Sequence, residues 1–323
     1  MASLATLSIA QHLNKQTYND KFKLESELNE ICDYLNTSRP TAVNLRIALD
    51  RVRNSIINDD DNVQNLKENA INECILIWSE DVERNKKMAD NGAKWLINHL
   101  ESTNAIKKDE KFSILTVCNT GSLATSGYGT AFGLITRLHE LDRLERAYYT
   151  QTTPYHQGTR LTAFEFIQLG IRSCMVCDTA VGSLISNKKV QAVAVGADRI
   201  AMNGDTANKI GTLQSAFFAN QFKLPFLVVA PRASVDQNLE NGAKIPIELR
   251  SSSEACTVNG LTNDNQLTSV RVAPKEIGTS DLHQVYNPGF DVTPSTLISS
   301  VVSEVGVAVH VNNNENIDMK SIL

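Results

Sequence analysis

The chain has 323 residues, enough for two domains with sizeable cores, and its hydrophobic content of 42% is ordinary for a globular protein. The net charge of −5, with no block of basic residues, argues against nucleic-acid binding, and no apolar run is long enough to span a membrane. The six cysteines are too dispersed for a disulfide framework and suit a reducing compartment.

Helical periodicity dominates residues 1 to about 106. The segment 1–15 has no Lys or Arg among its first six residues, so we interpret it as a helix of the fold rather than a signal peptide. Apolar side chains then recur at the helical period at Leu24, Leu28, Ile31, Cys32 and Leu35. The residues 37–40, TSRP, end that helix and begin another over 42–57, because proline suits a first helical turn.

A second helical stretch follows an acidic turn at 58–62. Residues 66–100 are predicted to be helical in two pieces, separated at Asp90–Gly92. The polar segment 101–110 is the best linker candidate.

From residue 112 onward, short apolar runs of strand length alternate with helices. The runs are 112–117, 146–150, 173–177, 192–195 and 226–230, and the helices lie near 125–141, 159–169, 179–187 and 210–222. This alternation predicts βαβ units that form a parallel sheet covered by helices on both faces.

Polar residues stand where four of these runs end. Cys118 follows the first run, residues 152–157 follow the second, Asp178 follows the third and Asp198 follows the fourth. Ligands of parallel sheets bind at the carboxyl ends of the strands. We therefore expect Cys118 and Asp198 to face one pocket at that edge of the sheet.

The segment FSILTVCNTGSLATSGYGTAFG, residues 112–133, carries the strongest local pattern. A strand leads to Cys118, then to a turn of small residues over 119–122, then to a helix from Leu123. Free loop N–H groups and a helix N-terminus would bind an anion and lower the pKa of a thiol at this junction. A lone cysteine at a strand end is nevertheless more often buried and inert, and the segment matches neither a dinucleotide fingerprint nor a P-loop.

Cys174 and Cys177 form a CxxC pair, which can indicate a metal site. They lie in a predicted strand, where an odd spacing points side chains to opposite faces, and no second pair completes a zinc site. We therefore expect no bound metal.

Residues 231–290 are less regular. A strand is predicted at 245–249, a turn at Asn287–Gly289, and a helix that starts at Thr293–Pro294. We expect the tail beyond about Val309 to be disordered.

Five long motifs carry a resemblance to a known family. They are TSRPTAVNL at 37–45, CNTGSLATSGYGTAFG at 118–133, PYHQGTRLTAFE at 154–165, VGADRIAMNGDTANKIGT at 195–212 and NPGFDVTPSTLI at 287–298. Together they resemble the methylthioribose-1-phosphate isomerases of methionine salvage over nearly the whole chain. That family is similar in fold to the regulatory subunits of the translation-initiation guanine-nucleotide exchange factor. The resemblance implies an α/β protein with a helical N-terminal domain, 1–108, followed by a Rossmann-like catalytic domain with a parallel sheet, 109–323.

The resemblance also implies an aldose–ketose isomerase that converts 5-methylthioribose 1-phosphate to 5-methylthioribulose 1-phosphate. Its catalytic residues would be Asp198 and Cys118, and its substrate-binding residues would be Arg39, Gln157, Asn208 and Lys209. Asn208 and Lys209 are expected at the start of a helix. From the residues alone, Asp198 reads equally well as a turn cap, and Lys209 as a solvated surface lysine.

The same resemblance implies a sugar phosphate as the small-molecule ligand, no cofactor, and a homodimer formed through the C-terminal domain. No nucleic-acid or membrane partner is expected. A cytoplasmic location is expected, and a nuclear one is also open.

Two departures from the family pattern leave other functions open. An Arg-Gly-Ala-Pro segment before the family's first long helix is expected to be missing, because Met1 aligns just after it. The loop after the second strand reads QTTPYHQGTRLT where the family has ETRPYNQGARLT, so Gln151, Thr153 and His156 replace an acid, an arginine and an asparagine. The alternatives are a diverged or truncated non-catalytic paralogue that binds a sugar phosphate, and a regulatory translation-factor-like subunit.

Overall fold

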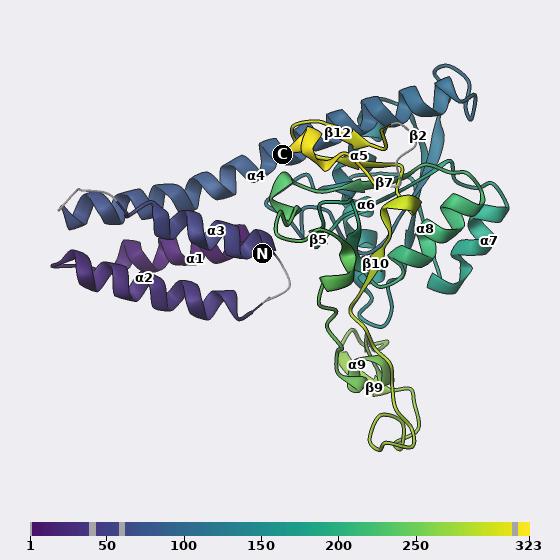
Figure 1. Cartoon of the computed structure of the whole chain (residues 1–323). Coiled ribbons are helices and arrows are strands. Elements are labelled where there is room, and N and C mark those ends of the chain that lie inside the picture. The colour runs from purple at the N-terminus through teal and green to yellow at the C-terminus, as the bar shows by residue number, and fades with distance from the viewer. Residues whose placement is uncertain (1, 39–42, 58–61, 312–315) are drawn as a thin grey trace.

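The computed structural model describes residues 2–38, 43–57, 62–311 and 316–323. Its N-terminal part is a bundle of helices, at the left of Figure 1. The helices are α1 (Ala2–Lys15), α2 (Lys21–Asn36), α3 (Val43–Asn54) and α4 (Val63–Ser102). Their apolar faces meet in one core, the bundle core, which includes Leu13, Leu28, Leu49 and Leu66. The helical character predicted for this part is confirmed.

The long helix α4 is continuous over 40 residues, so the predicted break at Asp90–Gly92 is wrong. Gly92 provides space rather than a turn, because a β-carbon on it would lie 3.2 Å from Leu134 and 3.4 Å from Val302. The N-terminal half of α4 belongs to the bundle core, whereas residues of its C-terminal half such as Met88 pack against the sheet. Close packing therefore offsets the low helix propensity of glycine here.

A seven-stranded sheet forms the centre of the rest of the chain, residues 112–311 and 316–323, which we call the sheet unit. Its strands are β1 (Phe112–Thr116), β2 (Leu144–Thr150), β3 (Ser173–Val176), β4 (Ala192–Val195), β7 (Phe226–Val229), β11 (Ser300–Val302) and β12 (Val307–Val309). The strand order is β12-β11-β7-β4-β1-β2-β3, and every neighbouring pair is parallel except β11 with β12. The first five strands match the predicted apolar runs, and the predicted Rossmann-like fold is confirmed.

Helices cover both faces of this sheet, as predicted. On one face, α5 (Ala131–Glu140) and α6 (Ala163–Gln168) pack with the C-terminal half of α4, and on the other lie α7 (Val181–Ser186) and α8 (Thr212–Gln221). Successive residues of β1 alternate between the two sides: Ile114 belongs to the first core and Leu115 to the second. Both faces are therefore covered, which leaves the strand ends as the place where a ligand can approach the sheet.

A second, three-stranded antiparallel sheet follows the carboxyl end of β4. Its order is β10-β6-β5, with β5 at Arg199–Ile200, β6 at Thr206–Lys209 and β10 at Phe290–Thr293. Asn208 pairs with Asp291, and Lys209 pairs with Phe290. The expectation that Asn208 and Lys209 begin a helix is wrong, because they end β6 and α8 begins at Thr212.

Three further predictions fail in the C-terminal part. Residues 245–249 form no strand beyond a single bridge from Leu249 to Pro288. The helix predicted from Thr293–Pro294 is only a 3₁₀ turn, Ser295–Leu297. Residues 316–323 are packed rather than disordered, since Ile317, Met319 and Ile322 are buried against the sheet. His310 pairs with Ile317 in a single bridge, and residues 312–315 of the predicted tail lie outside the described residues.

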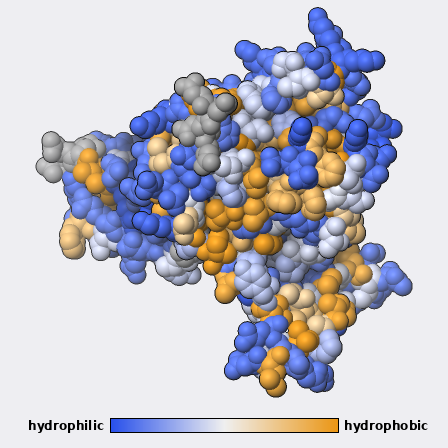
Figure 2. All heavy atoms as spheres, turned by 45° about the vertical axis from the view of Figure 1, so that its right-hand side comes forward, coloured by the Kyte–Doolittle hydropathy of each residue, from blue (hydrophilic) through white to orange (hydrophobic). Residues whose placement is uncertain are grey.

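The surface has two notable features. A hairpin of β8 (Thr257–Leu261) and β9 (Leu267–Arg271) projects from the sheet unit together with α9 (Ser252–Cys256) (Figure 1). Figure 2 shows apolar patches on the face of the molecule that it brings forward. Exposed apolar side chains of the sheet unit include Phe164, Ile167, Phe217 and Phe222. Within the described ranges, no helix is long and apolar enough to cross a membrane.

Candidate active site

The loops that follow β1, β2, β3 and β4 contact one another. The N–H of Cys118, after β1, donates to Oγ1 of Thr152, after β2, over 3.0 Å. The N–H of Thr152 in turn donates to Oδ1 of Asp178, after β3, over 2.8 Å. Gly196, after β4, has no room for a side chain, because a β-carbon there would lie 2.8 Å from Cγ2 of Thr120. The structure thus brings the predicted loops together at one edge of the sheet.

Cys118 has a strained backbone that its neighbours hold in place. Its φ of +70° lies in the left-handed region, which residues other than glycine rarely adopt. Thr152 accepts its N–H, and the hydroxyl of Thr162 donates to its carbonyl over 2.7 Å. Such a conformation persists only where the surroundings impose it, and these two hydrogen bonds do so here. The residue is also partly exposed, so it is more than a buried packing residue.

The segment after this cysteine differs from its prediction. It forms a loop over 119–130, and α5 begins at Ala131 rather than near Leu123. Two of its amides are also occupied: the N–H groups of Ser122 and Leu123 donate to the carboxylate of Glu165, over 2.6 and 3.3 Å. The expectation that these amides are free to bind an anion is therefore wrong.

The helix α4 holds the same loop from the other side. The N–H of Ser126 donates to Oδ2 of Asp81 over 2.8 Å, and the amide of Asn85 donates to the carbonyl of Gly127 over 2.9 Å. The loop after β1 is thus fixed both to the sheet unit and to the long helix that enters the bundle.

The loop after β2 contains an unsatisfied polar group. Oε1 of Gln157 is buried and has no hydrogen-bond partner among the residues that the structure describes. A buried amide oxygen without a donor is costly, so a ligand hydroxyl in contact with it would be stabilising. This property suits the substrate-binding role predicted for Gln157, which stays a prediction.

Thr153 and His156, two positions at which this loop departs from the family pattern, both form hydrogen bonds. The N–H and the hydroxyl of Thr153 donate to Oδ2 of Asp178, over 2.7 and 2.5 Å. A neutral side chain thus holds the carboxylate at the position where the resembling family has an arginine. The N–H of His156 donates to the carbonyl of Thr152 over 2.7 Å, which keeps this histidine within the loop.

Asp198 follows β4 at the same edge of the sheet and is partly exposed. Its N–H donates to the carbonyl of Ala207 over 2.9 Å, which fixes the loop against β6. Because Gly196 packs closely against Thr120, the loops that carry Asp198 and Cys118 are in contact. A pocket shared by the two side chains stays a prediction.

The end of β6 presents the other predicted substrate-binding residues. Asn208 is buried, and its amide donates to Oγ1 of Thr212 over 2.9 Å. Nζ of Lys209 lies 4.8 Å from the centre of the Phe290 ring, in a cation–π contact that fixes the ammonium group. Beside them, burial raises the pKa of Asp291 to about 6, against the lowering effect of backbone N–H groups.

Those N–H groups belong to the start of α8. Gly211 and Leu213 donate to the carboxylate of Asp291 over 2.8 and 3.0 Å. Asp291 therefore ties β10 to the turn that directly follows Asn208 and Lys209.

Two predictions concern residues away from these loops. Arg39 lies outside the described residues, so its substrate-binding role stays a prediction. Cys174 and Cys177 are both free and exposed, and β3 ends at Val176, before the second of them. Across the described ranges, no group of three His, Cys, Asp or Glu side chains is arranged to hold a metal ion.

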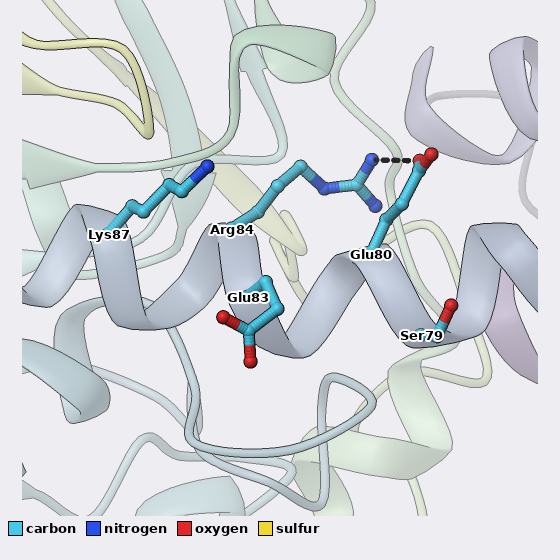
Figure 3. Close-up of a pocket in the computed structure, with 5 residues that line it drawn as sticks. All are labelled: Ser79, Glu80, Glu83, Arg84 and Lys87. Atoms are coloured by element: carbon cyan, nitrogen blue, oxygen red, sulfur yellow. Dashed lines mark hydrogen bonds and ion pairs between the residues drawn. The ribbon is translucent and has the colours of Figure 1, made fainter.

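A groove of about 390 Å³ runs along α4 (Figure 3). It is lined by Ser79, Glu80, Glu83, Arg84 and Lys87. All of these residues belong to one helix, and Arg84 already forms an ion pair with Glu80 over 3.5 Å. The groove contains none of the predicted site residues, so we place the candidate active site at the strand ends instead.

Comparison with known proteins identifies the family. Residues 1–309 match the initiation factor 2 subunit family. A methylthioribose-1-phosphate isomerase of Postia placenta is 45% identical over 100% of this chain and 87% of its own length. One of Laccaria bicolor is 48% identical over 98% of this chain and 85% of its own length. This chain belongs to the methylthioribose-1-phosphate isomerase family.

Solved structures agree with membership of the isomerase family. The 5-methylthioribose 1-phosphate isomerase from Pyrococcus horikoshii OT3 has a TM-score of 0.79 and 33% identity, covering 95% of this chain and 79% of that one. The translation initiation factor eIF-2B subunit delta from A. fulgidus has a TM-score of 0.74 and 32% identity, covering 95% and 82%. The predicted likeness between the isomerase family and the translation factors is confirmed.

The site prediction did not include the groups that hold this family member's cysteine. Thr152, Thr162 and Glu165 fix the loop after β1, and all three follow β2 in the sequence. Thr162 and Glu165 stand in the motif PYHQGTRLTAFE. The length of that motif was the sequence feature that could have pointed to further functional residues within it.

Proposed function

We propose that this protein acts on 5-methylthioribose 1-phosphate as an aldose–ketose isomerase and forms 5-methylthioribulose 1-phosphate. Family membership supports the reaction. The observation that carries the assignment to a site is that the loop of Cys118 contacts the loop of Asp198 at the carboxyl ends of the strands.

The chemistry requires hydrogen to move from C2 to C1 of the sugar. The bond between C1 and the ring oxygen breaks, the ring oxygen gains a proton, and the C2 hydroxyl loses its proton as C2 becomes the ketone carbon. The phosphate stays on C1. We assign the proton on the ring oxygen to Asp198 and the hydrogen at C1 and C2 to Cys118, as a general acid–base pair.

Substrate binding is assigned to the groups around these two. Gln157 offers an unsatisfied buried oxygen to a sugar hydroxyl, and Lys209 offers a cation to the phosphate. Arg39 and Asn208 complete the proposed set. This division gives the phosphate a cationic partner, as charge-assisted hydrogen bonds to phosphate require.

The test is turnover of 5-methylthioribose 1-phosphate by the purified chain, followed by phosphorus NMR. We expect the wild type to form the ketose, and Cys118→Ala and Asp198→Asn each to lower kcat by about 10²–10⁴-fold. Matched controls are Cys174→Ala and Asp142→Asn, which change the same groups at exposed positions. A folded wild type that forms no ketose contradicts the function, and active-site variants within threefold of wild type contradict the roles.

The regulatory alternative has support from the likeness to a translation initiation factor subunit. Such a subunit requires neither the cysteine nor the aspartate of these two loops. Retention of both therefore favours the enzyme over the regulatory subunit and over a paralogue without turnover.

We also propose that the protein forms a homodimer through its sheet unit. Phe164 and Ile167, three residues apart on α6, are 52% and 72% exposed, and adjoining apolar side chains on a surface mark interaction sites. Sedimentation at micromolar concentration is expected to show a dimer, and a monomer alone would contradict the proposal.

We place the protein in the cytoplasm, with the nucleus as a second location. Its six dispersed cysteines suit a reducing compartment. A fluorescent fusion in its host cell tests this, and a secreted fusion would contradict it.

A further inference from the structure

We propose that Glu165 is a positioning residue for Cys118: it holds the loop after β1 in the shape that keeps the cysteine strained, and it gives that loop a negative charge. The inference rests on the proposed function, because it takes Cys118 as a catalytic residue.

Glu165 is a buried carboxylate, only 6% exposed, on α6. Its Oε2 accepts the N–H of Ser122 over 2.6 Å. Its Oε1 accepts the N–H of Leu123 over 3.3 Å and Nδ2 of Asn119 over 2.8 Å. Three donors of one loop thus converge on one side chain, and both of its oxygens are used.

Thr162 acts on the same loop from the preceding turn. It ends a π-helical turn, Gly158–Thr162, and lies three residues before Glu165, so the two side chains share one helix face. Its hydroxyl donates to the carbonyl of Cys118 over 2.7 Å and accepts Nδ2 of Asn119 over 3.3 Å. Single π-helical turns of this kind are frequent at functional sites. The face formed by Thr162 and Glu165 therefore clamps the loop directly after the cysteine.

Gly121 shows how closely the carboxylate fits. A β-carbon at this position would collide with both oxygens of Glu165. A side chain at position 121 would therefore displace the carboxylate from the loop.

A buried carboxylate here has an electrostatic consequence. It occupies amides that would otherwise attract a phosphate, and its charge repels one. Glu165 therefore directs the substrate phosphate to another part of the site.

The test compares the alkylation of Cys118 in Glu165→Gln and in the wild type. Iodoacetamide labelling is followed against pH, and the peptide that contains Cys118 is quantified by mass spectrometry. Exposed Cys174 in the same protein is the internal reference. The matched control is Glu68→Gln, which removes an exposed carboxylate bonded to Gln64 in the bundle.

Loss of the carboxylate is expected to loosen the loop and to change the labelling rate of Cys118 by about two- to tenfold, with Cys174 unchanged. In turnover, kcat is expected to fall at least tenfold with KM within threefold of wild type, because Glu165 does not touch the substrate. A variant with correct circular dichroism and an unchanged labelling profile overturns the inference. Labelling needs no substrate, so a changed labelling rate in a chain without turnover would support Glu165 and contradict only the isomerase function.

A second variant covers the case in which Glu165→Gln does not fold. Gly121→Ala forces the carboxylate away from the loop and is expected to lower kcat by a similar factor. Combining the two substitutions is expected to add little, because both act on one contact. A Gly121→Ala protein with wild-type kcat, or losses that simply multiply in the double variant, would contradict the clamp.

Discussion

The strain at Cys118 predicts an unusual order of stability among variants. Replacement by alanine and by glycine removes the same thiol, so both variants are expected to lose turnover. The left-handed backbone, φ +70°, costs an L-residue about 1–2 kcal/mol, which glycine does not incur. Glycine also lowers the free energy of unfolding by about 0.4–1 kcal/mol, because it increases the conformational entropy of the unfolded chain. We therefore expect Cys118→Gly to be more stable than Cys118→Ala by about 0.8 kcal/mol, the difference between the centres of these two ranges.

Urea unfolding measures this difference if the signal comes from the sheet unit. The chain has two tryptophans, and Trp95 packs against the core that contains β1. A Trp78→Phe background leaves Trp95 as the only tryptophan reporter. Ala147→Gly in β2 is the control, because glycine in a buried extended strand is expected to destabilise by at least about 0.5–1 kcal/mol. A Cys118→Gly protein equal to or less stable than Cys118→Ala would refute the reasoning.

Three further substitutions test other parts of the structure. Asp291 has a folded pKa of about 6 against an ordinary 3.8, so its contribution to stability is present at low pH and is lost as pH rises through about 6. Asp291→Asn should remove about 3 kcal/mol of that pH dependence in urea titrations, and an unchanged pH profile would be contrary to this. Lys209→Met should raise KM by about 10–100-fold through loss of a charge-assisted contact, and a KM within twofold of wild type argues against a phosphate contact. Gly92→Val should lower the free energy of unfolding by about 1–3 kcal/mol through overpacking against Leu134, whereas neutrality would mean that α4 can shift.

The sheet and its helices could be predicted because their signals are local. The run Ala192–Val195 is buried along its whole length in β4, and a strand covered on both faces must be apolar throughout. The same rule accounts for β7. The position of the site at the strand ends followed from that topology alone.

The shape of the loop after β1 could not be predicted, because its partner is remote. The small residues near Leu123 resemble a helix start, but their amides are satisfied by Glu165, which follows Ser122 by 43 positions. Local propensity cannot anticipate a side chain that arrives from another element. For the same reason β6 was missed: its polar residues Asn208 and Lys209 are extended because they pair with β10, far along the chain.

Because α4 is continuous, it can transmit a rotation from the helical bundle to the sheet unit. At about 1.5 Å per residue, its 40 residues extend over roughly 60 Å. Its N-terminal half packs in the helical bundle and its C-terminal half packs against the sheet. Near the middle, Asp81 and Asn85 form hydrogen bonds with the loop that follows Cys118. A rigid rod gripped in this way converts a tilt at the bundle into a displacement at the loop: over half its length, about 30 Å, a rotation of about 2° amounts to roughly 1 Å. A partner that binds the bundle and tilts it would therefore displace the loop that follows Cys118.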